Sequence, residues 1–130
     1  MKLTMQGEYA IRAMLELTIQ HGKGLISAKE LASRQDIPPV FLTKILSTLT
    51  KAGLITSHRG SQGGIKLAKE PSKITIKSVI EAVEGPFTLN ICLGEAGVCG
   101  RKPQCKVHTM WYRAQEAMLK ELGVTLDKLI

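Results

Sequence analysis

A glycine-rich stretch in the middle of the chain, residues 60–64, limits the folds that this sequence can adopt. It lies between two short runs of strand-forming residues, 54–59 and 65–67. Because glycine permits sharp turns, two such runs around it are typical of a β-hairpin. A glycine-rich turn between a strand and a helix would instead be typical of a dinucleotide site. A second strand follows here, so this turn is not that of a Rossmann fold.

Three helices are predicted ahead of the hairpin. Apolar residues recur at helical spacing over 7–20, and shorter helices are indicated over 28–34 and 39–52. Ser27 and Glu30 match the capping box that often opens a helix, which places the start of the second helix at residue 28.

The third helix has clear signals at both ends. Pro39 suits the first helical position, and Gly53 suits the left-handed residue that follows a helix. We expect this helix to bury five apolar side chains, which are Phe41, Leu42, Ile45, Leu46 and Leu49.

Two further helices are predicted beyond the hairpin, over 76–84 and 107–122. The fold class is therefore mainly α with a small β-hairpin wing, which is a winged helix-turn-helix followed by a long C-terminal helix. We expect three parts. These are a DNA-binding domain over 1–86, a cysteine-rich loop over 87–106, and the last helix with its tail over 107–130.

The charge of the chain is concentrated in its centre. The whole chain has a net charge of +7, and residues 40–80 contain seven basic residues against Glu70 alone, a net of +6. Such a segment favours a polyanionic partner. The alternative is a solvated basic surface that only keeps the protein in solution.

In a winged helix-turn-helix, the third helix enters the major groove and the wing approaches the backbone or the minor groove. Amides at the start of the second helix can hold a phosphate. The candidate DNA-contacting residues are Ser27, Lys29, Val40, Thr43, Lys44, Ser47, Lys51, His58, Arg59, Ser61 and Gln62. A protein-interaction module with the same three helices and hairpin is the alternative.

All three cysteines of the chain, Cys92, Cys99 and Cys105, lie in one loop-like stretch close to His108. Thiolates and imidazole are ligands for iron–sulfur clusters, zinc or copper. No signal peptide or membrane-spanning run is evident, so we expect a cytoplasmic protein that does not enter a membrane. In that reducing compartment, an odd number of clustered cysteines favours a metal or redox site over a disulfide.

An enzyme is the contrasting hypothesis, and the sequence does not favour it. A thiol oxidoreductase would need a Cys-x-x-Cys motif and a βαβ pattern, and neither is present. Zinc is the main chemical competitor of a cluster. However, zinc ligand pairs usually lie two to four residues apart, and both gaps between the cysteines are longer.

Motifs along the whole chain carry a family resemblance. They are Met1-Lys2-Leu3-Thr4 with Tyr9-Ala10, Leu46 with Ala52-Gly53-Leu54-Ile55, Arg59-Gly60 with Gly63-Gly64, Glu84-Gly85-Pro86, the three cysteines, Trp111, and Thr125-Leu126. On these residues the chain resembles the bacterial winged-helix iron–sulfur transcription regulators, the family of IscR and NsrR. Its wing and cysteine motifs are specific, whereas the helix patterns alone are not.

The resemblance implies a homodimeric transcription regulator that binds a roughly palindromic operator in double-stranded DNA, either as a repressor or as an activator. The last helix would pair with its twin through Val107, Met110, Trp111, Ala114, Met118 and Leu122. The alternative for this apolar stripe is packing against its own domain.

The resemblance also implies a 2Fe–2S cluster held by Cys92, Cys99, Cys105 and His108, with Glu8 as the rival fourth ligand. A 4Fe–4S cluster, zinc, or no metal remain as alternatives. So does a repressor that responds through a protein partner. The signal is left open among iron supply, oxygen, nitric oxide and redox state. Thr43 departs from the acidic residue that some members carry there, so their promoter choice need not transfer.

Overall fold

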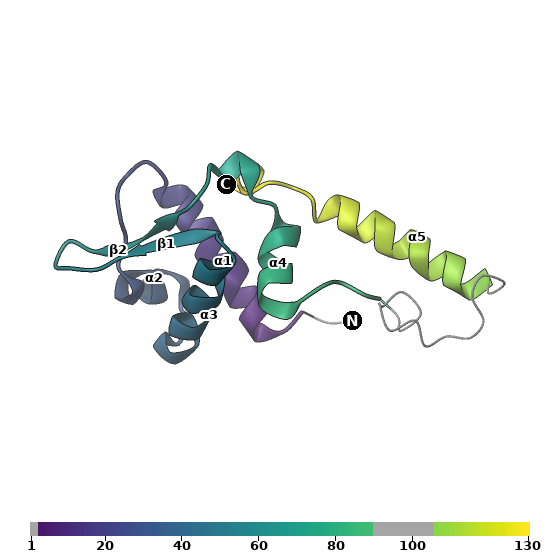
Figure 1. The fold of residues 1–130 in the computed structure, drawn as a ribbon, viewed down its shortest axis with the longest axis horizontal. Coiled ribbons are helices and arrows are strands. Elements are labelled where there is room, and N and C mark those ends of the chain that lie inside the picture. Colours follow the sequence, from purple (N-terminus) through teal and green to yellow (C-terminus); the bar gives the residue numbers. More distant parts are fainter. Residues whose placement is uncertain (1–2, 90–105) are drawn as a thin grey trace.

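The computed structural model describes residues 3–89 and 106–130 (Figure 1). The elements follow in the order α1 (Met5–Gln20), α2 (Ala28–Gln35), α3 (Pro39–Lys51), β1 (Ile55–His58), β2 (Gly64–Leu67), a 3-10 turn (Pro71–Lys73), α4 (Ile76–Glu84), α5 (Lys106–Glu121) and a last 3-10 turn (Leu126–Leu129). The predicted winged helix-turn-helix with a long C-terminal helix is confirmed.

Local capping explains where the first helices begin. The Ser27 hydroxyl accepts a hydrogen bond from the Glu30 amide at 3.1 Å, so the predicted cap of α2 is present. The Thr4 hydroxyl accepts one from the Gly7 amide at the start of α1. α3 begins at Pro39 without a side-chain cap, as suits proline at the first helical position.

β1 and β2 form an antiparallel hairpin in which Ile55 pairs with Leu67 and His58 with Gly64. The hairpin is extended by a bridge between Ile26 and Ile65, whose amides and carbonyls exchange two hydrogen bonds of 3.2 and 2.8 Å. The wing is thereby fixed to the segment that leads into α2.

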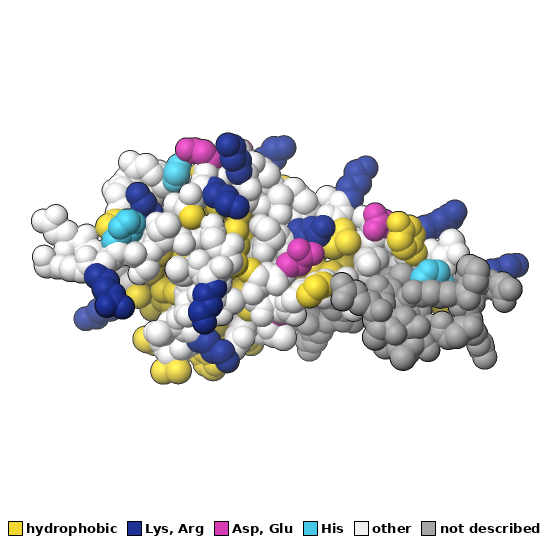
Figure 2. Space-filling model, viewed as in Figure 1, with side chains coloured by type: hydrophobic (Ala, Val, Ile, Leu, Met, Phe, Trp, Pro, Cys, Tyr) yellow, Lys and Arg dark blue, Asp and Glu magenta, His cyan; other side chains and the backbone are white. Residues whose placement is uncertain are grey.

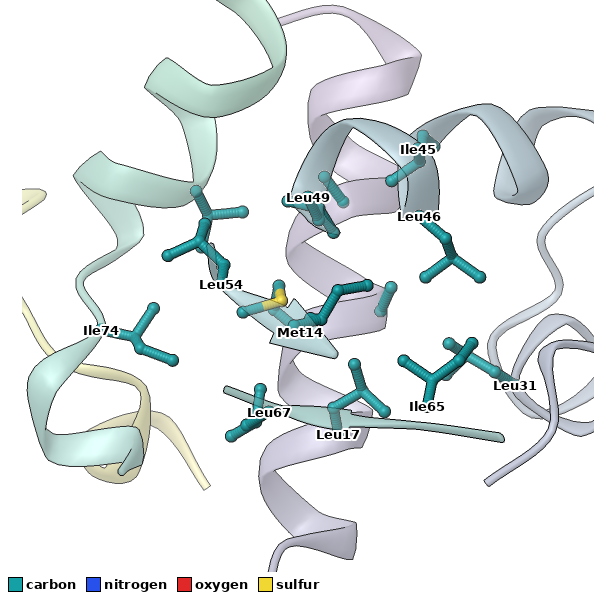
Figure 3. Packing of buried hydrophobic residues seen from close by; sticks show 14 of the residues in the cluster. Met14, Leu17, Leu31, Ile45, Leu46, Leu49, Leu54, Ile65, Leu67 and Ile74 are labelled. Carbon is teal, nitrogen blue, oxygen red and sulfur yellow. The ribbon is translucent and has the colours of Figure 1, made fainter. Parts of the chain in front are cut away.

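The core lies between α1, α3, α4 and the inner face of the hairpin (Figure 3). Its largest fully buried side chains include Met14 and Leu17 from α1 and Leu49 from α3. Aliphatic residues fill it almost entirely. Phe87 is also part of it, although the sequence analysis assigned that residue to the cysteine loop.

The prediction that Phe41 is buried is wrong. The inward positions of α3 are Leu42, Ile45, Leu46 and Leu49, whereas Phe41 is 46% exposed. Position 41 is about 100° around the helix from position 42. Its ring instead lies beside Tyr9 of α1, with 6.1 Å between the two ring centroids.

α5 projects away from the other described elements, and none of its residues is buried (Figure 1). The chain then returns to the core through Leu126, whose amide donates to the Ile74 carbonyl at 3.0 Å. Amides of Ile76 and Lys77, at the start of α4, donate to carbonyls of Val124 and Leu122. None of the described helices combines the length and apolar character that a membrane crossing requires.

Candidate DNA interface and metal ligands

A groove of about 710 Å³ lies between the start of α2, the outer face of α3 and the hairpin. Its lining residues are Ser27, Ala28, Thr43, Leu46, Ser47, Thr50, Lys51, Ile55, Ser57, Arg59, Gly63, Gly64 and Ile65. Five of the eleven predicted DNA-contacting residues are among them. Residues that are up to 38 positions apart in the sequence, from Ser27 to Ile65, therefore share one concave surface.

The other six predicted DNA-contacting residues are exposed around this groove. They are Lys29, Val40, Lys44, His58, Ser61 and Gln62. Figure 2 shows Lys and Arg side chains next to hydrophobic ones over the part of the molecule that carries α3. The exposed basic side chains give this surface the positive potential that the charge pattern predicted.

Thr50 and Ser57 line the groove but were missed by the sequence analysis. Helical spacing could have found Thr50, because it lies one turn beyond Ser47. Strand alternation could have found Ser57, because side chains two positions apart point to the same face and Ile55 also lines the groove.

Two threonines on α3 already donate their hydroxyl protons in hydrogen bonds within the helix. Thr43 donates to the Pro39 carbonyl at 3.0 Å, and Thr50 donates to the Leu46 carbonyl at 2.7 Å. While these bonds hold, either hydroxyl can only accept a further hydrogen bond. On this surface they suit donors, such as the exocyclic amino groups of bases, better than phosphate oxygens.

The angle between α1 and α2 is fixed by a polar cluster. Glu16 is only 9% exposed, and its carboxylate accepts hydrogen bonds from Arg34 at 3.0 Å and from Gln35 at 2.9 Å. Arg34 also binds Glu30. The hydrogen bond to Glu16, followed by that to Glu30, raises the pKa of Arg34, so its guanidinium stays charged. The cluster holds α2 in place beside α3.

Of the predicted metal ligands, His108 and Glu8 lie in the described part of the chain. Cys92, Cys99 and Cys105 lie outside it. Among the described residues alone, no three His, Cys, Asp or Glu side chains converge on a point that could hold a metal ion. The predicted ligand set therefore stays a prediction, because its three cysteines lie outside the described residues.

His108 lies in the first turn of α5, and its Nδ1 atom is buried without a hydrogen-bond partner among residues 3–89 and 106–130. Glu8 differs, because its Oε1 lies 3.3 Å from Nε of Arg12, whose guanidinium stacks over the Tyr9 ring. A buried, unsatisfied ring nitrogen is unfavourable unless it gains a hydrogen-bond partner or, when unprotonated, binds a metal. Together with three thiols, the residues present fit a soft metal group.

Two contacts fix the chain just ahead of the segment that contains the cysteines. The Leu89 amide donates to Oε1 of Gln115 on α5 at 2.9 Å. Glu84, at the end of α4, accepts from the amide of Thr4 at 2.8 Å and also from its hydroxyl. Leu89, ahead of this segment, is tied to α5, and Lys106, which follows the segment, is the first residue of α5. The chain is therefore connected to the same helix before and after the cysteines.

The comparisons with known proteins agree with this architecture. The family described as Rrf2, iron-dependent transcriptional regulator, matches residues 3–130. The chain is 34% identical to the HTH-type transcriptional regulator IscR of Aliivibrio salmonicida, over all of this chain and 77% of that protein. It is 38% identical to IscR of Vibrio atlanticus, over all of this chain and 75% of that protein.

Two solved structures share the fold. IscR of T. potens superposes with a TM-score of 0.79 at 28% identity, covering 99% of this chain and 85% of that one. CymR, described as the global cysteine regulator of B. subtilis, superposes with a TM-score of 0.82 at 32% identity, covering 99% and 95%. The winged-helix fold, the groove between α3 and the hairpin, and these matches lead to one conclusion: the chain belongs to the Rrf2 family and is an IscR-like transcriptional regulator.

Proposed function

We propose that this regulator is a homodimer that binds DNA and senses iron–sulfur or redox status through a 2Fe–2S cluster. In this proposal Cys92, Cys99, Cys105 and His108 hold the cluster. The observation that carries it is the buried Nδ1 of His108, which has no hydrogen-bond partner among the described residues and lies three positions after the last cysteine. Glu8 is the weaker candidate for the fourth ligand, because its carboxylate already pairs with Arg12.

A bound cluster would supply a redox-active group whose loss or oxidation reports on iron and oxidants. The chain itself provides the coupling. Leu89 and Lys106 flank the cysteine segment, and both are tied to α5, the first through Gln115. Ligation by His108 would therefore hold the segment against the first turn of α5. Without it, the Leu89–Gln115 contact would remain as the link to α5 that the described residues provide.

Dimerisation through α5 is supported by the apolar side chains that its N-terminal half leaves exposed. Val107 is 54% and Met110 53% exposed, although both belong to the predicted stripe. Met118 and Leu122, at the other end of that stripe, pack partly against the core of their own chain. We therefore place the centre of the proposed interface between Val107 and Ala114. Residues 107–130 would then contribute both to the dimer interface and to the core of their own chain.

For DNA binding, we propose that α3 enters the major groove while Arg59 on the hairpin reaches the backbone or the minor groove. Two-fold pairing through α5 predicts half-sites about one DNA turn apart. Double-stranded DNA would then be the partner of residues 1–86, and the protein would act in the cytoplasm. The named relatives are transcriptional regulators, so we propose no enzymatic reaction.

The cofactor is tested by purifying the full chain anaerobically, recording its visible spectrum and counting iron and sulfide. We expect a coloured protein with about two irons and two sulfides per protomer. His108→Ala should lower the iron content, whereas the matched change Thr109→Ala, at an exposed neighbouring position, should not. About four irons would favour a 4Fe–4S cluster, and a colourless protein with stoichiometric zinc would contradict the cluster.

Sensing is tested by comparing the loaded and metal-free proteins on one operator at the same salt concentration, because protein–DNA affinity depends strongly on salt. A regulator whose ligation state matters must bind the two differently. Equal affinities would leave a DNA-binding protein without direct sensing. That result would favour the alternative, a repressor that responds through a protein partner.

A further inference from the structure

Val40 is the most exposed large hydrophobic side chain among the described residues, with 82% of its surface accessible. It is the second residue of α3, at the end of the helix that contacts base edges in helix-turn-helix proteins. Exposed to this extent, it adds little to folding, and β-branched valine is not a strong helix former. The fold alone gives no reason for an apolar side chain at this position.

The surroundings of Val40 fit DNA better than protein. One stripe along α3 runs from Val40 through Lys44 and Ser47 to Lys51, at spacings of three or four residues, and all four are exposed. The lysines suit a polyanion, whereas a second copy of this same basic surface would be repelled. Phe41, 46% exposed, adds a second apolar surface in the same first turn.

In the major groove, the only apolar group on a base edge is the C5-methyl of thymine. A valine side chain has no hydrogen-bonding atom, so it cannot discriminate the donor and acceptor patterns of the other bases. We propose that Val40, flanked by Phe41, packs against a thymine methyl in each operator half-site and so selects thymine at that position. This inference rests on the proposed DNA-binding function and adds a specificity determinant to it.

The test uses the full chain and a random library of DNA duplexes, from which bound sequences are selected. Each thymine of a selected duplex is then replaced by uracil, which removes only the C5-methyl and keeps the base pairing. We expect one thymine per half-site at which the replacement weakens binding by about three- to fivefold, as expected for burying one methyl group.

Two variants assign the effect to the residue. Val40→Ala should weaken binding to the thymine duplex and bring the affinities for thymine and uracil duplexes to within about 1.5-fold of each other, since the methyl then has little to pack against. Ile19→Ala is the matched control, because Ile19 is also exposed (48%) but lies in the last turn of α1 and not on α3. It should retain the full difference between thymine and uracil.

Four outcomes would overturn the inference. They are selected duplexes without a thymine that responds to uracil, a thymine effect that persists in Val40→Ala, an equal loss in Ile19→Ala, and a Val40→Ala variant that changes only the oligomeric state. In each of these cases the proposed DNA binding would still stand, provided that the protein had selected specific duplexes from the library. Failure to select any duplex would refute the proposed function and this inference together.

Discussion

Replacing Gly63 by alanine tests how closely the hairpin turn is packed. A Cβ atom there would lie 2.2 Å from the His58 carbonyl oxygen, 2.8 Å from the Arg59 carbonyl carbon and 2.9 Å from the Gly60 oxygen. All three are backbone atoms, so no side-chain rotation can relieve the clash. Gly63 is not among the glycines with positive φ, and the conflict is therefore one of space alone.

The size of the effect follows from these distances. An ordinary contact begins at 3.4 Å, so the His58 carbonyl and residue 63 must separate by 3.4 − 2.2 = 1.2 Å. The Gly63 amide donates a hydrogen bond to the Gly60 carbonyl at 3.0 Å. A displacement of about 1.2 Å that opens the turn would break this hydrogen bond. Overpacking and a lost hydrogen bond together should lower the free energy of unfolding by about 1–3 kcal/mol.

The assay is urea denaturation at fixed protein concentration, followed by helical circular dichroism. Gln62→Ala is the control for stability, since it changes an exposed neighbour on the same turn without adding an atom near the backbone. Gly63→Ala should also weaken DNA binding, because the clash displaces the backbone that carries His58 and Arg59. An unchanged urea midpoint together with unchanged DNA affinity would refute the packing of this turn.

Four other predictions follow from single contacts. Leu49→Ala, at a fully buried position of α3, should lower the free energy of unfolding by about 2–5 kcal/mol in urea denaturation. Arg59→Ala should weaken binding to all duplexes alike and reduce the salt slope by about one when affinity is titrated against salt. Val107→Asp, at an exposed apolar position of α5, should convert dimer to monomer in analytical ultracentrifugation. Gln115→Leu removes the acceptor of the Leu89 amide and should speed loss of the visible absorption of the loaded protein on exposure to air.

Each of these has a matched control in the chain. Thr48→Ala changes a partly exposed neighbour of Leu49 and should cost less stability, and Thr109→Asp adds the same charge to α5 away from the apolar stripe. Lys128→Ala removes a positive charge from the C-terminal turn and should leave the salt slope of DNA binding unchanged. Glu116→Gln alters the residue next to Gln115 and should not change the rate of bleaching. If a variant and its control gave the same result, the role inferred for the corresponding contact would be wrong.

Local patterns were sufficient to predict most of the fold. Helical periodicity, the Ser27 cap and proline at the start of α3 act within a few residues of one another, so each helix could be located without its partners. The glycine-rich turn predicted the hairpin for the same reason. For the candidate DNA surface, the sequence was sufficient to name residue types and their positions on the helices. It could not predict that these residues would form one groove together with Ser57 and Thr50.

What the sequence alone determined is the set of elements, the charge of the central segment and the family, because these depend on short-range spacing and composition. Tertiary structure decided which apolar residues face inward. Phe41 lies beside Tyr9 rather than in the core, and α5 packs only its C-terminal end partly against the core, because packing geometry selects among faces that periodicity leaves equivalent. The contacts from Glu16 to Arg34 and from Leu89 to Gln115 join residues 18 and 26 positions apart. No local pattern encodes such pairs, since they exist only once the helices have been brought together.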